Sequence, residues 1–468
     1  MKEHPATVRF RIPRGWRIAT SLDALPGKTA TFTAPNYDVL TDCPIELGKF
    51  LLKSFRYRGK EHRWGIHGPG NYNVARTIRE TKKIVDAAVK MFGDLPYRHY
   101  TFFLHTNPAG GGGLEHLNSC DLMMAPDSFH PREKEERFLD LVAHEFFHLW
   151  NVKRIRPEAL GPFDYQRENY TRLLWVMEGI TNYFSPLILR RAGIVSTRGY
   201  LKRLAERIQA WREKPGRFVQ SLEESSFDTW IKFYQPGENS ANAEISYYEK
   251  GELVGLLLDL ELRRRTANRK SLDDVMRLLY RRYAARGVGF PEDGFQAAAE
   301  KICGGSLASF FRTCVSGTSE LNFERALLAI GLRLFKKPKK EKDGKLLPRR
   351  IAHLGIKVEK QGDNRLLISR VVRGTAAWRD GVNPGDELLA IDGMKAGAES
   401  WEKRIEEKSP GDRVEVALFR RGVLQTVPVT LGARENIDYA IEPVAKPTPL
   451  QRKIAESWLD DQWKALTS

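Results

Sequence analysis

The sequence predicts an α+β protein with a short β segment at its start, a mainly helical middle part and a small β domain before a final helix. The first supporting observation is the alternation of Val8, Phe10 and Ile12 with other residues, which is typical of a strand. The second is a long middle region with apolar residues at helical spacing, and the third is a return to short strands with Gly-rich turns. The expected units are a β segment at 1–45, a mainly helical domain with a small sheet at 46–335, a basic linker at 336–349, a β domain at 350–433 and a tail with a helix at 434–468.

Composition excludes several classes of protein. With 468 residues, of which 41% are hydrophobic and 29% charged, the chain is globular and neither collagen-like nor disordered. We expect no transmembrane segment, because the most apolar run, from Leu253 to Leu262, contains two acidic residues. Residues 1–5 are not followed by the apolar stretch of a signal peptide, so we expect a cytoplasmic protein. The four cysteines are widely spaced, which argues against a disulfide scaffold.

The chain is basic, with a formal net charge of +17. Such a charge is compatible with nucleic acid, anionic membranes or acidic peptides as partners. Part of it is local, because Lys and Arg crowd the stretch from Gly331 to Arg350, and a solvated linker is the simplest interpretation of such a block. Since no nucleic-acid-binding motif accompanies the charge, we expect no nucleic-acid partner.

The central motif is His144-Glu145-Phe146-Phe147-His148. The preceding residues predict a helix, with Pro131 at its first position, acidic residues after it and apolar residues along one face. On a helix, residues four positions apart share a face, so His144 and His148 can bind one zinc ion. Glu145 can then act as a general base toward water. The alternative is a buried helix with two incidental histidines.

Glu178 is the candidate for a third zinc ligand. It lies thirty positions after His148, inside an apolar stretch from Leu174 to Tyr183 that predicts a second helix. A carboxylate on an apolar face is costly unless it is paired or bound to a metal. The alternative is a glutamate on the helix surface. We expect Pro186 to kink or end this helix.

Two further segments complete a candidate peptidase site. Gly112 and Gly113 would let a ligand approach the backbone, and Glu115 could bind the α-ammonium group of a peptide. The alternative is a flexible glycine loop with a solvated glutamate. Tyr248 lies at the start of a predicted helix, where its hydroxyl could stabilise an oxyanion, and the alternative is a tyrosine that only fills the core. Gly251 would permit close helix packing.

These segments, in this order, resemble the gluzincin metallopeptidases and in particular the glycyl aminopeptidase family, whose members join a thermolysin-like catalytic domain to a PDZ domain. The resemblance runs from residues 36–38 to Arg263 and is most specific in the string from His144 to Pro157. It implies a mainly helical thermolysin-like domain, and it implies that residues 1–45 are the remnant of a larger β domain. The implied site residues are His144, His148 and Glu178 as ligands of one Zn²⁺, Glu145 as base, Glu115 with Gly112 and Gly113 for the substrate amino terminus and Tyr248 for the oxyanion.

Residues 350–433 resemble a bacterial protease-type PDZ domain, through the segments 351–358, 368–374 and 376–393. PDZ domains bind a peptide C-terminus as an added strand, with loop amides receiving the carboxylate. That loop corresponds here to Leu354, Gly355 and Ile356, which are therefore the candidate peptide-binding residues. The alternative is a domain that only packs as a lid.

The expected function is a zinc aminopeptidase that removes N-terminal residues from peptide substrates, and the resemblance implies Gly or Ala as the residues removed. The alternatives are a zinc endopeptidase and a non-catalytic PDZ adaptor that binds peptides. The basic residues after the zinc helix, Lys153, Arg154 and Arg156, leave two interpretations open, substrate contact and packing at the helix end.

Overall fold

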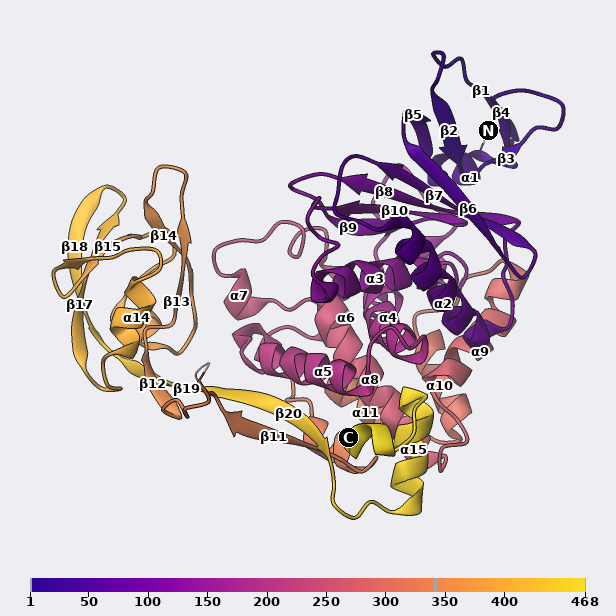
Figure 1. Cartoon of the computed structure of the whole chain (residues 1–468). Helices are drawn as coiled ribbons and strands as arrows, with labels where there is room; N and C mark the ends of the chain where they lie inside the picture. Colours follow the sequence, from indigo (N-terminus) through magenta and orange to yellow (C-terminus); the bar gives the residue numbers. More distant parts are fainter. Residues whose placement is uncertain (1, 341–342, 468) are drawn as a thin grey trace.

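Two large hydrophobic cores organise the chain in the computed structural model, which describes residues 2–340 and 343–467. One core extends through the main body from Phe55 to Leu459, and the other lies within residues 352–431. Figure 1 shows the second core as a separate β lobe beside the main body. The α+β class predicted from the sequence is confirmed. Positions 341 and 342 of the expected basic linker lie outside the described residues.

The N-terminal segment forms small antiparallel sheets against the main body. Ala19 and Phe50 pack against Phe103 of the next sheet, and this contact attaches the segment to the main body. The elements are β1 (Ala6–Arg9), β3 (Asp23–Ala24) and β4 (Thr31–Ala34) in one sheet, β2 (Arg17–Thr20) and β5 (Ile45–Gly48) in another, and α1 (Tyr37–Asp42) between β4 and β5.

A five-stranded sheet carries the groove described below. Its strands, in spatial order, are β6 (Leu51–Tyr57), β7 (Lys60–His67), β8 (His99–Thr106), β10 (Ser119–Met124) and β9 (Gly111–Glu115). Strands β7, β8 and β10 run parallel, whereas β9 pairs antiparallel with β10 at the edge. Phe102 and Phe103 are adjacent on β8 and point to opposite faces, because side chains alternate along a strand. Helices α2 (Val74–Phe92) and α3 (Arg132–Phe147) cover the face of Phe102 (Figure 1).

Helices make up the rest of the main body. The predicted second helix consists of one π-helical turn, η2 (Trp175–Gly179), followed directly by α4 (Ile180–Arg191). We expected Pro186 to kink or end this helix. It does not end the helix, because α4 continues for five residues beyond it. The buried residues on both sides of Pro186 hold the helix against the core. The other helices are η1 (Glu158–Leu160), α5 (Thr197–Arg212), η3 (Pro215–Phe218), α6 (Leu222–Phe227), α7 (Ser240–Ala243), α8 (Tyr247–Arg265), α9 (Leu272–Arg282), η4 (Ala284–Arg286), α10 (Gly294–Cys303), α11 (Ala308–Cys314) and α12 (Phe323–Leu328).

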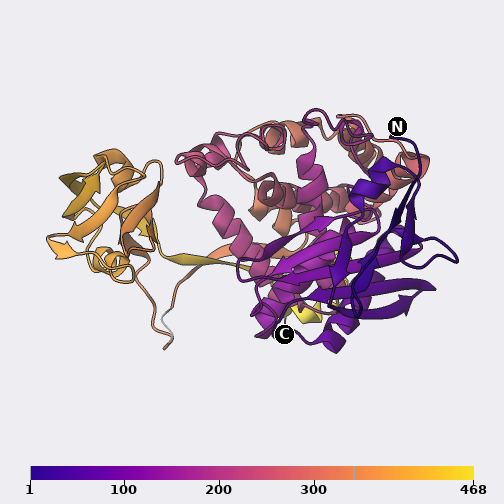
Figure 2. The ribbon, with the colours of Figure 1, turned by 90° about the horizontal axis from the view of Figure 1, so that it is seen from above.

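The β lobe is inserted between two paired strands of the main body. Strand β11 (Leu332–Pro338) leads into the lobe and β20 (Ile437–Pro443) returns from it, as an antiparallel ribbon visible in Figure 2. Residues 336–338, which we expected in the basic linker, therefore belong to a strand. The lobe consists of β12 (Arg350–His353), β13 (Ile356–Lys360), β14 (Leu366–Val371), α13 (Ala376–Asp380), β15 (Glu387–Ile391), β16 (Met394–Lys395), α14 (Trp401–Glu406), β17 (Arg413–Arg420), β18 (Val423–Thr430) and β19 (Gly432–Glu435).

One buried side chain joins the two bodies away from the ribbon. Asn242 of α7 donates a hydrogen bond to the carbonyl of Val371 (2.8 Å) and accepts one from the amide of Arg373 (2.8 Å). Because Asn242 is only 4% exposed, both bonds are shielded from water.

The C-terminal tail returns to the main core. Helices α15 (Pro449–Leu459) and α16 (Lys464–Thr467) follow β20, and the predicted terminal helix is thus confirmed. Trp458 is fully buried and its indole N–H donates to the hydroxyl of Tyr183 at 3.0 Å. That hydroxyl donates in turn to Asp259 of α8 at 2.5 Å. Among the described residues, no helix is both long and apolar enough to cross a membrane.

Candidate active site

Helix α3 presents one face to the core and the other to a groove. It begins at Arg132, with Pro131 just before the first helical residue rather than at it. Two acidic residues in its first turn, Glu133 and Glu135, favour this end because the helix dipole is positive there. The core face is formed by Phe138, Leu139, Val142 and Phe146. The opposite face carries His144 toward the groove, and His148 follows at the end of the helix.

The three predicted metal ligands converge on one point. The Nε2 atoms of His144 and His148 lie 2.9 Å apart, and each is within 3.3 Å of Oε2 of Glu178. Two ligands on zinc bonds of about 2.0–2.1 Å in tetrahedral geometry would be separated by roughly 3.3 Å. Two imidazoles and one carboxylate are also a donor set that zinc prefers. The arrangement therefore fits a zinc ion held by these three side chains.

The electrostatics of this cluster couple the imidazole of His148 to the carboxylate of Glu178. Nδ1 of His148 lies 2.6 Å from the carbonyl oxygen of Asn151 and donates to it, which leaves Nε2 directed at the cluster. Burial opposes a charge on His148, but Glu178 outweighs it and raises the pKa of His148 to about 10. Burial likewise opposes a charge on Glu178, yet the two histidines hold the pKa of that carboxyl well below its ordinary value. Glu178 therefore stays ionised.

Asn151 positions the third ligand, and the sequence analysis did not identify it. Its side chain is fully buried and donates to the carbonyls of Val176 (2.8 Å) and Met177 (3.1 Å) and to the hydroxyl of Thr181 (3.1 Å). These acceptors flank Glu178 in the π-helical turn and the start of α4. Asn151 thus ties the end of the His148 helix to the turn that carries Glu178. Its place inside the family-specific string from His144 to Pro157 was the available sequence signal.

Two glycines bring Tyr248 to the same site. Gly179 of η2 and Gly251 of α8 are in backbone contact, since a Cβ atom added to Gly251 would lie 2.8 Å from the Cα atom of Gly179. Tyr248 stands three residues before Gly251, and its ring centroid lies 6.5 Å from that of His144. Burial, followed by the charge of Glu178, raises the pKa of Tyr248 far above its usual value. Its hydroxyl is therefore protonated and available as a donor.

Glu145 lies beneath the glycine strand. It is 3% exposed, and its Oε2 atom is buried without a hydrogen-bond partner among the described residues. A Cβ atom on Gly113 would lie 2.4 Å from Oε1 of Glu145, so any other residue at this position of β9 would displace the side chain of Glu145. Burial raises the pKa of Glu145 to about 7, against the opposing charges of His144 and His148. An unpartnered carboxylate of this kind is available to take a proton.

Glu115 completes the groove at the end of β9. One of its carboxylate oxygens lies within 4.8 Å of a carboxylate oxygen of Glu145 and of a ring nitrogen of His148. The glycine segment is an edge strand rather than the flexible loop that was its alternative interpretation. The groove has a volume of ≈ 540 Å³. Residues that line it but were not identified from the sequence are Arg137, Asp140, Leu141, Asn182, Ser185 and Tyr234.

Two of the basic residues after α3, Arg154 and Lys153, make structural contacts. Arg154 donates to the carbonyls of Leu117, Leu149 and Pro96, which favours the packing interpretation. Lys153 pairs with Asp42 of α1 at 2.5 Å and so attaches the N-terminal segment to the end of α3.

The candidate peptide-binding loop lies in the β lobe, between β12 and β13. The side chains of Leu354 and Ile356 are buried in the core of the lobe, so only the backbone here is available to a peptide. The carbonyls of Leu354 and Gly355 accept hydrogen bonds from the amides of Ala377 and Val372. Gly355 has a φ of +88° and packs against Thr375, which requires glycine.

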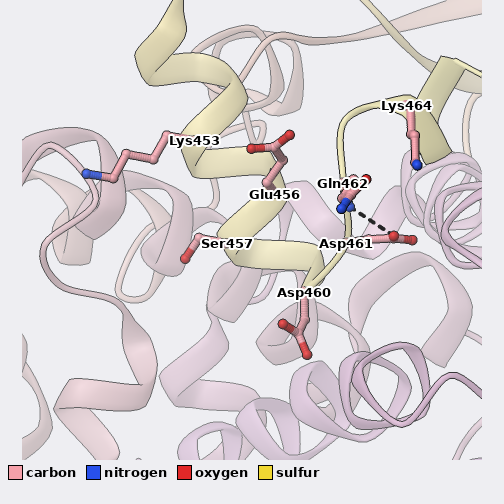
Figure 3. A pocket seen from close by; sticks show the side chains of 7 residues that line it. All are labelled: Lys453, Glu456, Ser457, Asp460, Asp461, Gln462 and Lys464. Atoms are coloured by element: carbon pink, nitrogen blue, oxygen red, sulfur yellow. Dashed lines mark hydrogen bonds between the residues drawn. The ribbon is translucent and has the colours of Figure 1, made fainter.

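Another hollow lies between α15 and the turn that follows it (Figure 3). It is lined by Lys453, Glu456, Ser457, Asp460, Asp461, Gln462 and Lys464. Its lining contains none of the predicted site residues, all of which the structure describes. The groove over α3 is therefore the candidate active site.

Comparison with known proteins agrees with this geometry. The M61 glycyl aminopeptidase family matches residues 137–254, and the peptidase M61 N-terminal domain matches residues 1–49. A PDZ domain matches residues 352–431. A search of the curated proteins found no match.

Solved structures add a full-length likeness. The chain is similar to an aminopeptidase N family protein from Idiomarina loihiensis, with 28% identity, a TM-score of 0.89 and coverage of 98% of this chain and 80% of that one. An M1 zinc metallopeptidase from Deinococcus radiodurans shares 15% identity, with a TM-score of 0.43 over 68% of this chain and 64% of the other, which is too distant for inference. The chain is thus a metallopeptidase whose residues 137–254 and 1–49 are similar to the M61 glycyl aminopeptidases and whose residues 352–431 form a PDZ domain.

Proposed function

We propose that the chain is a zinc-dependent aminopeptidase that removes N-terminal residues, glycine or alanine in particular, from peptides. The observation that carries this proposal is the convergence of His144, His148 and Glu178 within 3.3 Å of one another, in a groove that also contains Glu115. A free carboxylate in the groove is a partner for the ammonium group that every unmodified peptide carries at its first residue.

The side chains of the groove divide the hydrolytic work. A zinc ion, when bound by His144, His148 and Glu178, would supply a Lewis acid and make water more acidic. Glu145 is positioned to accept the proton of the attacking water and to pass it to the leaving amine, because its buried Oε2 has no other partner among the described residues. The protonated hydroxyl of Tyr248 would donate a hydrogen bond to the oxygen on which negative charge develops.

Substrate orientation follows from the edge strand. Strand β9 pairs with β10 on one side and faces the groove on the other, so a peptide can lie along it in extended form. Glu115 at the end of β9 would hold the amino terminus and so place the first peptide bond over Glu145. The cleaved bond is thereby fixed by its distance from the amino terminus of the peptide.

One assay tests metal dependence and exopeptidase character together. We expect the protein to hydrolyse Gly- and Ala-initiated tripeptides with a free amine, to leave N-acetylated versions intact and to lose activity with a chelator. Equal cleavage of acetylated peptides would show an endopeptidase instead. Absence of both bound zinc and cleavage would contradict the proposal and favour a peptide-binding adaptor.

We further propose that the PDZ domain binds a peptide C-terminus by strand addition to β13. Strand β13 is the edge strand of its sheet, and the loop before it contains Gly355. Binding of peptides that differ only in C-terminal amidation tests this, since loss of the carboxylate removes the group that the loop amides receive.

A further inference from the structure

Arg137 is an exposed cation that lines the groove. It lies on α3, two helical turns before His144, and its side chain is exposed. Within residues 2–340 and 343–467, no hydrogen bond or ion pair involves its guanidinium group. By contrast, two arginines that contact the same helix are paired, Arg203 with Glu136 and Arg207 with Glu252. Since no described residue pairs with it, the guanidinium of Arg137 is available to a ligand.

The direction of the groove places Arg137 downstream of the cleavage point. Along β9, Gly113 lies over Glu145, and Glu115, two residues later, is also close to His148. Strand β9 and helix α3 therefore run in the same direction along the groove. A peptide whose amino terminus is held at Glu115 extends the opposite way, past Glu145 and toward Arg137.

The distance between Arg137 and His144 along α3 matches the length of a short peptide. Seven helical residues separate Arg137 from His144, which corresponds to about 10 Å along the axis. An extended peptide covers about 3.3–3.6 Å per residue, so this distance is about three residues. From the carbonyl of the first residue, two to three residues lead to the carboxylate of a tripeptide or tetrapeptide, within reach of a long arginine side chain.

We propose that Arg137 binds the C-terminal carboxylate of tri- and tetrapeptides and makes them the preferred substrates; this rests on the proposed aminopeptidase function. A guanidinium group is suited to this, because its planar fork can bind a carboxylate through two hydrogen bonds. Asp140 lies one turn away in the same groove and would repel a carboxylate. Its charge is directed to Arg207, whose guanidinium lies 3.5 Å from its Oδ2 atom.

The decisive comparison uses one tripeptide in three forms: Ala-Ala-Ala with free ends, its C-terminal amide and its N-acetyl derivative. For the native protein we expect kcat/KM to be about tenfold higher for the free acid than for the amide, mainly through KM, as suits a partly exposed ion pair. In Arg137→Gln the ratio of kcat/KM for the acid to that for the amide should fall to about one, and Arg137→Lys should retain part of the preference. Arg281→Gln is the matched control, because Arg281 is an exposed helical arginine outside the groove.

The proposal for Arg137 would be overturned if the native protein cleaved the free acid and the amide equally well. It would also be overturned if Arg137→Gln kept the full preference for the free acid. Failure of the aminopeptidase function gives a different result, namely no cleavage or equal cleavage of the acetylated peptide. Calorimetry decides about Arg137 even then. Glu145→Gln protein should bind the free acid about tenfold more tightly than the amide, and the Glu145→Gln/Arg137→Gln double variant should not distinguish them. Equal binding of acid and amide by Glu145→Gln protein would contradict the inference.

Discussion

Gly179 and Gly251 touch through their backbones: a Cβ atom on Gly179 would lie 2.4 Å from the Cα atom of Gly251. The contact joins the π-helical turn that carries Glu178 to the helix that begins with Tyr247 and Tyr248. The position of Tyr248, the proposed oxyanion donor, relative to Glu178, the proposed metal ligand, therefore depends on a close approach of two glycines.

The first prediction follows from this contact. Gly251→Ala should lower the free energy of unfolding by about 1–3 kcal/mol, because the added carbon meets backbone that must move. Since Tyr248 moves with α8, kcat should fall as well. Chemical denaturation and steady-state kinetics measure the two effects. Gly305→Ala is the control, because a Cβ atom there meets nothing within 4 Å. Equal stability and kcat for the two variants would refute the role of the contact.

The second prediction concerns the base. Glu145→Gln should retain about one zinc ion per chain and lose at least about 10²–10⁴ in kcat, because the amide keeps the shape of the side chain but cannot accept the proton. Metal analysis and peptide hydrolysis give the two values. Glu133→Gln, in the exposed first turn of the same helix, should behave like the native protein. A metal-loaded and fully active Glu145→Gln protein would exclude Glu145 as the base.

The third prediction concerns the residue that positions Glu178. Asn151→Ala removes three hydrogen bonds to the segment around Glu178 and should weaken zinc binding about 10–100-fold. Competition with a chelating dye measures the Kd. Trp458→Phe controls for general loss of stability, because it removes a buried hydrogen bond outside the groove. If both variants weaken zinc binding equally, Asn151 has no specific positioning role.

The fourth prediction is a pH dependence of stability. His62 of β7 is fully buried, and its Nε2 atom lies 2.7 Å from the hydroxyl of Tyr97. Burial lowers the pKa of His62 from 6.5 to about 4, so between these values the unfolded chain binds more protons than the folded one. The stability that the neutral His62 contributes is complete above pH 6.5 and is lost as the pH falls toward 4.

Between about pH 7 and pH 5 the native protein should therefore lose about 2 kcal/mol more free energy of unfolding than His62→Gln. Urea denaturation with a chelator present, so that metal release does not contribute, measures the difference. Parallel pH curves for the two proteins would show that His62 is not responsible.

The local apolar pattern made helix α3 predictable from the sequence. The face of Phe138, Val142 and Phe146 fixes which side of α3 is buried, and the two histidines then must share the other side. Glu178 could be predicted for a related reason, because a carboxylate in an apolar stretch needs a partner. These features depend on residues close together in the chain.

Features that depend on distant partners were not predictable in the same way. Glycines have a low preference for strands, and β9 exists because Gly111–Glu115 pairs with the strand β10 that follows it. The ribbon pairs Leu332 with Pro443, across the whole PDZ domain, and no local pattern indicates such a partner. Pro186 did not end its helix, because burial of its neighbours outweighs the lost backbone hydrogen bond.

The insertion of the PDZ domain within the ribbon sets an order of assembly during synthesis. The ribosome releases strand β11, then all of the PDZ domain, and only afterwards β20 and the helix with Trp458. The hydrophobic core of the main body therefore lacks the side chain of Trp458 until the PDZ domain has left the ribosome. If translation stopped within the PDZ domain, the nascent chain would expose the apolar surface that Trp458 covers in the folded protein. Such exposed apolar surfaces bind chaperones.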